Sequence, residues 1–327
     1  MLAGLAVQEL AHRHQRLGIS THEEKHIMRM RTSLIALSLL LPPSTAFAQT
    51  DMPADYKAVL ETLGKQGDFK DGVLKVNIPR SDLHVVVNGI ATPTPFGFGG
   101  WIAMAKGTEG MDVMMGDLVL TEDQVNPVMS ALLDHGLEAT ALHNHFFWET
   151  PRIFYMHVHG HGQASDLATR VKPALDLIGK GSASAASAAG RAIDGKLDTA
   201  ALSKAIGYPG DQSGAVYKIT IGRSDLKVQE MGATINARMG LNTWAAFYGT
   251  DADAVVAGDV AMLASEVTPV LKAMRANGID VVAIHHHMLG TQPTIFFLHY
   301  WGKGPADKLA VGVRAAVDQL GRAKPGK

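Results

Sequence analysis

Residues 141–161 read ALHNHFFWETPRIFYMHVHGH, and residues 283–303 read AIHHHMLGTQPTIFFLHYWGK. These two stretches lie 142 residues apart and hold nine of the chain's 15 histidines. Because residues two apart on a strand point to the same face, His143 and His145 share one face, and so do His157 and His159. A chain without cysteine that gathers its imidazoles in this way is predicted to build a metal or proton-transfer site there.

The two histidine stretches belong to a longer internal repeat. Upstream of them, an Arg-Ser-Asp-Leu motif and a tryptophan (Trp101, Trp244) recur at an offset of 143. After a slip of one residue the match continues through a Gly-Asp pair and three histidines. The paired histidines are His143, His145 and His157 against His285, His287 and His299. Units of this length exceed solenoid repeats and therefore indicate two like domains.

The domain bounds follow from a low-complexity run between the copies. Residues 180–190 read KGSASAASAAG, a composition typical of a flexible linker. We therefore expect one repeat domain at 52–179, a linker at 180–193 and a second repeat domain at 194–321.

Each repeat is predicted to contain the element order αβββαββα. Helical spacing, capping residues and glycine stops predict three helices in the first copy, at 56–63, 121–135 and 164–178. In the second copy they predict helices at 198–206 and 305–320, and the repeat implies a middle helix between these two. The first three strands are expected at 73–90, 99–106 and 111–120, with counterparts at 215–231, 243–248 and 254–261. Strands in runs favour an α+β fold of two tandem homologous domains, each a mostly antiparallel sheet with packed helices.

The first 48 residues are predicted to lie outside the fold. Residues 28–48 combine a basic start, a short apolar run and an Ala-Phe-Ala signature, which is typical of a secretory signal peptide. Residues 1–27 precede that signal and are interpreted as a mis-called N-terminal extension. We therefore expect a periplasmic or secreted protein with no membrane anchor after cleavage, because the apolar run is too short to span a bilayer.

The charge balance excludes one class of partner. Without the first 48 residues the chain carries a net charge of −3, which argues against a nucleic-acid partner. A small-molecule or cell-envelope ligand is compatible with that balance. The oligomeric state and the substrate do not follow from the sequence.

The hairpin predicted around Pro151 carries the candidate chemistry. Such a turn places His145 opposite His157 and His143 opposite His159, close enough for shared coordination of one ion. Glu149 would supply a ligand or a general base. This set suits a divalent transition metal, zinc before copper, nickel, iron or manganese, and a metal-bound water would allow hydrolysis.

The second copy keeps only part of this set. His285, His287 and His299 remain candidate ligands, but Thr291 replaces Glu149 and Trp301 replaces His159. The first repeat is therefore expected to hold the more complete site.

The motifs as a whole resemble the LppY/LpqO family of exported bacterial proteins with a domain of unknown function. The resemblance rests on the duplicated Gly-Asp-Leu-Val-Leu segment, on LHNH at 142–145 followed by Glu149, Pro151 and Arg152, and on FLHYWG at 297–302. It implies export and an internal duplication but no established activity.

Three hypotheses for function remain open at the level of sequence. One is a metalloprotein with His143, His145 and His157 as ligands and Glu149 as ligand or base. The second is a non-enzymatic module that binds a sugar, a peptide or a cell-wall fragment. The third is a metal buffer or chaperone.

Overall fold

The computed structural model describes residues 51–180 and 189–321, and these described residues belong to one compact unit. The predicted extension at 1–27, the predicted signal peptide at 28–48 and most of the predicted linker lie outside the described residues. Among the helices that are described, none is long and apolar enough to cross a membrane.

The first repeat forms one six-stranded antiparallel sheet with three helices. The helices are α1 (Ala54–Leu63), α2 (Glu122–Asp134) and α3 (Ala164–Leu175). The sheet has the order β1-β2-β5-β6-β9-β7, with β1 (Asp68–Lys70), β2 (Val73–Pro79), β5 (Gly99–Lys106), β6 (Asp112–Thr121), β9 (Ile153–Gly162) and β7 (Glu138–His143). The short strands β3 (Val85–Val87), β4 (Ile90–Thr92) and β8 (Glu149–Thr150) form a separate small sheet.

The second repeat has the same architecture. Its helices are α4 (Thr199–Ile206), α5 (Ala264–Ala276) and α6 (Ala306–Val317). Its sheet has the order β10-β11-β14-β15-β17-β16, with β10 (Gly210–Ser213), β11 (Val216–Gly222), β14 (Asn242–Gly249), β15 (Ala254–Leu263), β17 (Ile295–Gly304) and β16 (Asp280–His285). The strands β12 (Val228–Glu230) and β13 (Ala233–Ile235) pair outside that sheet. The α+β fold of two tandem repeats is confirmed.

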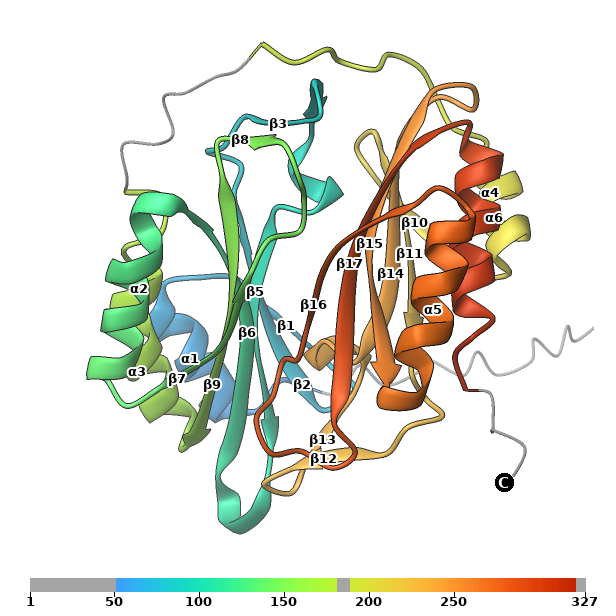
Figure 1. Ribbon diagram of the computed structural model, residues 1–327. Coiled ribbons are helices and arrows are strands. Elements are labelled where there is room, and N and C mark those ends of the chain that lie inside the picture. Colours follow the sequence, from blue (N-terminus) through green and yellow to red (C-terminus); the bar gives the residue numbers. More distant parts are fainter. Residues whose placement is uncertain (1–50, 181–188, 322–327) are drawn as a thin grey trace, which may run out of the picture. The chain divides into compact units, whose positions relative to one another are not determined.

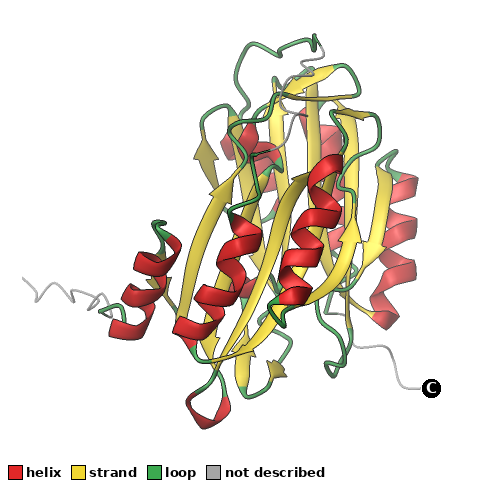
Figure 2. Cartoon of the chain, turned by 90° about the vertical axis from the view of Figure 1, so that its left-hand side faces the viewer, coloured by secondary structure: helices red, strands yellow, loops and turns green. Residues whose placement is uncertain are grey.

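Each sheet is buried on both faces, and strand alternation decides what lies on each face. On β9, Met156 and Val158 belong to the core under the helices, whereas Ile153 and Tyr155 belong to a core that contains residues of both repeats. The helices therefore cover the outer faces, and the inner faces of the two sheets meet each other (Figures 1 and 2). His157 lies on the inner face, because it is two residues from Tyr155.

Two arms join the repeats reciprocally. The arm of the first repeat, which we define as residues 80–98, places Phe96 and Phe98 in one core with Val216 and Tyr248 of the second repeat. The arm of the second repeat, residues 223–241, packs its apolar side chains against the first sheet, and the backbone N–H of Thr108 donates to the carbonyl of Met231 at 2.9 Å. Apolar burial on both arms stabilises the pairing of the sheets.

The long first strand predicted in each repeat is not continuous, and the one predicted at 215–231 is wrong because it splits into β11 and the arm strand β12. The predicted strand at 73–90 is wrong, because it splits into β2 and the arm strands β3 and β4. Gly64 and Gly207 end α1 and α4 in the left-handed conformation, as predicted for helix C-caps. In α2, the side chain of Gln124 accepts from the backbone N–H of Thr121 at 3.2 Å, which caps the predicted middle helix.

Candidate metal centre

Six histidines from the two repeats converge between the inner faces of the sheets. Their rings stack in three close pairs, each pair containing one residue of each repeat. The centroid distances are 3.7 Å for His143–His285, 3.7 Å for His145–His299 and 3.9 Å for His157–His287. Since His143 matches His285, His145 matches His287 and His157 matches His299 in the duplication, the cluster has approximate two-fold symmetry.

Backbone carbonyls orient four of these rings. The Nδ1–H of His157 donates to the carbonyl of Gly116 at 3.3 Å, and that of His299 donates to Gly258 at 3.2 Å. His143 and His285 make longer contacts of 3.5 and 3.4 Å with the carbonyls of the residues that follow them. The Nε2 atoms of all four rings are buried and have no hydrogen-bond partner among the described residues. A ring whose Nδ1–H is held by a carbonyl offers its Nε2 lone pair to a metal.

Three groups of side chains have ligand atoms close enough to hold an ion. Within each group the ligand atoms lie within 4.8 Å of one another. The groups are His143, His285 and His299; His157, His285 and His287; and Asp117, His143 and His157. Two of the three groups take histidines from both repeats, so the candidate site is a joint product of the duplication.

Burial keeps the cluster neutral. It lowers the pKa of His143 to about 4 and that of His285 to about 2, each from an ordinary value of 6.5. The pKa values of His145, His157 and His299 fall well below 6.5, first through burial and then through the neighbouring imidazoles. Neutral imidazole is the form that binds metals, so near neutral pH the cluster is ready to coordinate an ion.

The observed strand register differs from the predicted one. His143 lies opposite Tyr155, and His159 lies opposite Glu138, so the predicted pairing of His143 with His159 and of His145 with His157 is wrong. A tight hairpin around Pro151 does not set the register, because Glu149 and Thr150 leave the main sheet and pair with β3 of the first arm. At His143 the strands pair in an even register, so His143 keeps the face that His157 occupies.

His159 lies on the same strand as His157 but has carboxylate partners. Its Nδ1 is 3.1 Å from Glu138 Oε2, and its Nε2 is 3.0 Å from Glu230 Oε1 of the second arm. Burial disfavours its charged form, but Glu230 and Glu138 outweigh burial and raise its pKa. His159 is in none of the three ligand groups within the described ranges.

Glu149 lies on β8, which pairs with the first arm rather than with the main sheet. Its side chain is 7% exposed and accepts from Asn144 Nδ2 at 3.4 Å, and burial raises its pKa. A second cavity of about 460 Å³ is lined by Glu149, His143 and Trp148, among others. Glu149 therefore has access to one edge of the cluster through His143.

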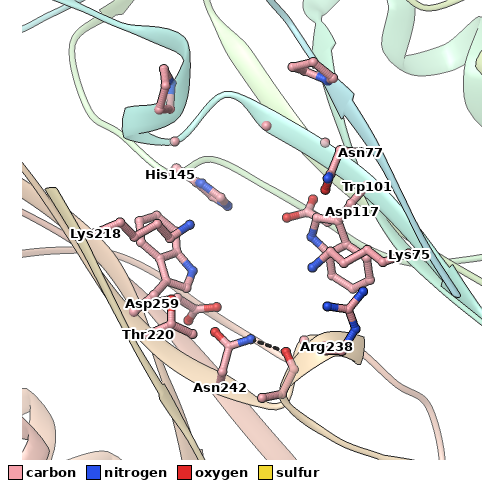
Figure 3. A pocket seen from close by; sticks show the side chains of 18 of the residues that line it. Lys75, Asn77, Trp101, Asp117, His145, Lys218, Thr220, Arg238, Asn242 and Asp259 are labelled. Atoms are coloured by element: carbon pink, nitrogen blue, oxygen red, sulfur yellow. Dashed lines mark hydrogen bonds between the residues drawn. The ribbon is translucent and has the colours of Figure 1, made fainter. Parts of the chain in front are cut away.

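A larger cavity of about 590 Å³ opens beside the cluster and is lined by both repeats. It is lined by His145, His287 and His299, together with charged and aromatic side chains. Figure 3 shows Lys75 and Asp117 on one side of this cavity and Lys218 and Asp259 on the other. A concave site of this size, next to candidate ligands, is suited to a small molecule.

The sequence interpretation missed the cavity residues as a set. Burial raises the pKa of Asp117 to about 7, and it lowers the pKa of Lys75 and of Lys218 to about 8 each. Lys75 and Lys218 recur at the same offset of 143 as the tryptophans beneath them. A comparison of charged residues between the two copies was the signal that could have found them.

The family model described as Domain of Unknown Function (DUF1259) matches the chain twice, at residues 57–177 and 200–319. The chain belongs to this family. No curated protein matches the chain. Two solved structures show a low similarity. EtuB from Clostridium kluyveri is 10% identical over 77% of this chain and 90% of that chain, with a TM-score of 0.18. A trimeric bacterial microcompartment shell protein PduB is 13% identical over 78% of this chain and 91% of that chain, with a TM-score of 0.19. TM-scores this low carry no argument about fold or function.

Proposed function

We propose that this chain binds a divalent transition metal ion between its two repeats. The observation that carries the proposal is the set of four histidines with Nδ1 turned to backbone carbonyls and Nε2 buried and unpartnered among the described residues. Buried polar atoms normally have partners, so four converging exceptions indicate a missing ligand of the imidazoles. The ligand atoms of His143, His285 and His299 lie within 4.8 Å of one another, so one metal ion would satisfy these three, and His157 belongs to a separate group with His285 and His287.

Zinc is the first candidate, with copper, nickel, iron and manganese after it. The donor set is imidazole with the carboxylate of Asp117, and the chain has no cysteine. Such donors suit zinc at about 2.0–2.2 Å and also accept the other four metals. A bound ion would act as a Lewis acid beside the larger cavity, the chemistry used in metal-assisted hydrolysis.

The larger cavity also supports the hypothesis of a ligand-binding module. Its size and its mixture of Trp101, Trp244 and charged groups fit a small molecule rather than a bare metal store. Five of the six rings are buried and His285 is half-buried, and this burial disfavours the rapid exchange that a metal buffer needs.

We further propose export, on the composition of residues 28–48 and on the resemblance to the LppY/LpqO family. Expression of the full chain with N-terminal sequencing of the mature protein tests this proposal. A mature protein that begins near Gln49 in the periplasm or medium is expected. Retention of residues 28–48 in a cytoplasmic protein would contradict export.

Metal analysis of untagged protein tests the principal proposal. Zinc, copper, nickel, iron and manganese are measured by mass spectrometry after purification and again after loading. The wild-type chain is expected to retain one of them, and His143→Asn and His299→Asn are expected to lose it. His84→Asn, in an exposed histidine outside the cluster, is the matched control. A well-folded wild-type protein that retains none of the five metals in either measurement would exclude the site.

A further inference from the structure

Two lysines at matched positions face the larger cavity. Lys75 of β2 and Lys218 of β11 are half-buried, and both line the cavity of about 590 Å³. The Nζ of Lys75 lies 4.4 Å from the ring centroid of Trp101, and that of Lys218 lies 4.0 Å from that of Trp244. Within the part of the chain that the structure describes, neither ammonium has a carboxylate within 4.0 Å.

A third cation reaches the same cavity. Arg238 of the second arm pairs with Asp68 through one end of its guanidinium. Its Nε is buried and has no hydrogen-bond partner among the described side chains and backbone groups. Burial lowers the pKa of Lys75 first, and the charges of Lys218 and Arg238 lower it further. Lys75 therefore lies close enough to the other two cations to be repelled by them, while Asp68 and Asp117 offset part of this repulsion.

The two carboxylates in the cavity are turned toward the histidines. Asp117 forms a ligand group with His143 and His157. Asp259 Oδ1 accepts from the backbone N–H of Leu298 at 3.2 Å, and its Oδ2 lies 4.0 Å from His287 Nε2. Asp117 and Asp259 act on Lys75 and Lys218 only from a distance, so neither lysine has a paired counterion in the described part of the chain.

We infer that the larger cavity binds a small organic dianion, a dicarboxylate, with one acid group directed to Lys75 and the other to Lys218. The two lysines stand on opposite walls of the cavity, related by the symmetry of the duplication (Figure 3). A ligand with two separated acid groups matches that arrangement, and a buried cation is favoured by pairing with an anion. The cavity is far larger than a single inorganic anion needs, so an organic body joins the two acid groups.

Dicarboxylate binding does not itself require a metal ion. Only the purpose of such binding, which brings a ligand next to the metal-binding histidines, rests on the proposed function. The dicarboxylate would lie against His145, His287 and His299, which line the same cavity. Ligand binding and metal binding are separate measurements on the same protein, so either can fail without the other.

Calorimetric titration of the full chain at low ionic strength tests the inference. The probes are dicarboxylates of three to eight carbons, with acetate and inorganic phosphate for comparison. One chain length is expected to bind at least roughly tenfold more tightly than acetate, the lower end for a charge-assisted pair. The affinity is expected to fall with added salt, because the pairs are ionic.

Single substitutions assign the binding to the two lysines. Lys75→Met and Lys218→Met keep an apolar stem on each tryptophan and remove the charge, and each is expected to weaken the best dicarboxylate at least roughly tenfold. Lys75→Arg is expected to retain most of the affinity. Lys57→Met, in an exposed lysine of α1 outside the cavity, is the matched control and is expected to bind as the wild type does. Thermal unfolding of each variant checks that it folds.

The outcomes separate the two proposals. Metal retention with no dicarboxylate binding overturns the inference and leaves the proposed function intact. Dicarboxylate binding that depends on both lysines, in a protein that holds no metal, supports the inference and overturns the proposed function. Binding of phosphate or acetate as tight as that of every dicarboxylate overturns the two-acid ligand, and so does binding that survives both Lys→Met substitutions.

Discussion

The two repeats agree at the centre of the molecule and differ at the arms. The six cluster histidines and the cavity pairs Lys75/Lys218, Trp101/Trp244 and Asp117/Asp259 recur in both copies. His159 and Trp301, in contrast, occupy matched positions with different neighbours. His159 meets Glu230 of the second arm, and Trp301 packs on Phe96 and Phe146 of the first repeat, at centroid distances of 5.9 and 5.8 Å. The inner faces of the two repeats therefore carry the same types of functional side chain, whereas the contacts that each repeat makes with the other repeat's arm differ.

The largest expected effect tests whether both repeats supply the metal ligands. His285→Asn in the second repeat is expected to weaken metal binding as much as His143→Asn in the first, because the two rings stack at 3.7 Å in the same cluster. The loss is expected to exceed the roughly 10–100-fold that removal of an outer-shell partner costs. Competition with a chromophoric chelator measures it. A His285→Asn protein with wild-type affinity would assign the site to the first repeat alone.

The shared cluster also predicts a steep dependence of stability on pH in the metal-free protein. The pKa of His143 is about 4 in the folded chain and 6.5 in the unfolded chain, so the unfolded chain takes up protons first as the pH falls. The free energy of unfolding is therefore full above pH 6.5 and declines from pH 6.5 toward 4. Each histidine contributes a slope of about 1.4 kcal/mol per pH unit.

Urea unfolding at a series of pH values measures this slope. The double variant His143→Asn, His285→Asn removes one matched pair and is expected to flatten the slope. His159, whose pKa is raised, contributes with the opposite sign and is lost as the pH rises. A free energy of unfolding that is constant from pH 7 to 4.5 would contradict neutral burial of the cluster.

A third comparison concerns the glycine before each cavity aspartate. A Cβ at Gly258 would lie 2.1 Å from the carbonyl oxygen of Trp244 and 2.3 Å from the hydroxyl of Tyr300. At Gly116 the nearest atoms are the Trp101 carbonyl oxygen at 2.8 Å and a methyl of Ile102 at 2.9 Å. Gly258→Ala is expected to destabilise by about 3 kcal/mol and Gly116→Ala by about 1 kcal/mol, as measured by urea unfolding. Equal losses would indicate that the backbone relaxes alike in both copies.

A smaller effect is expected at the buried arginine of each arm. Arg223 pairs with Glu266 at 2.8 Å, whereas the matched Arg80 bonds the neutral amide of Gln124 at 3.0 Å. Glu266→Gln reproduces the chemistry of the first repeat and is expected to cost about 1 kcal/mol of unfolding free energy, against about 3 kcal/mol for Glu266→Ala. Chemical denaturation of both variants checks this order. Equal losses would show that the charge of Glu266 matters more than its hydrogen bonds.

The smallest effect is expected at Glu149. Glu149→Thr installs the residue of the second repeat, and metal content is expected to stay within measurement error, because Glu149 bonds Asn144 and belongs to none of the described ligand groups. Metal analysis beside wild type is the measurement. A marked loss of metal would restore Glu149 as a ligand.

Local signals in the sequence predicted the elements, and tertiary packing decided the site. Glycine stops such as Gly64 and the capping of α2 act within one turn, so they are readable from the chain. The pairing of β8 with β3, which replaces the predicted hairpin turn, joins segments far apart in the chain and leaves no local signal. The sequence also does not specify that the two inner faces meet, and this packing alone brings His143 against His285.

The position of the cluster has a consequence for the order of folding. The rings of its three close pairs are 142, 154 and 130 residues apart in the chain, so each pair is a contact of very long sequence separation. Contacts of this kind form late, because the entropy of closing the intervening chain opposes them until both sheets exist. A ribosome or translocase that delivers the chain from its N-terminus would thus complete the first sheet well before the second, and metal loading would mark the last step of maturation.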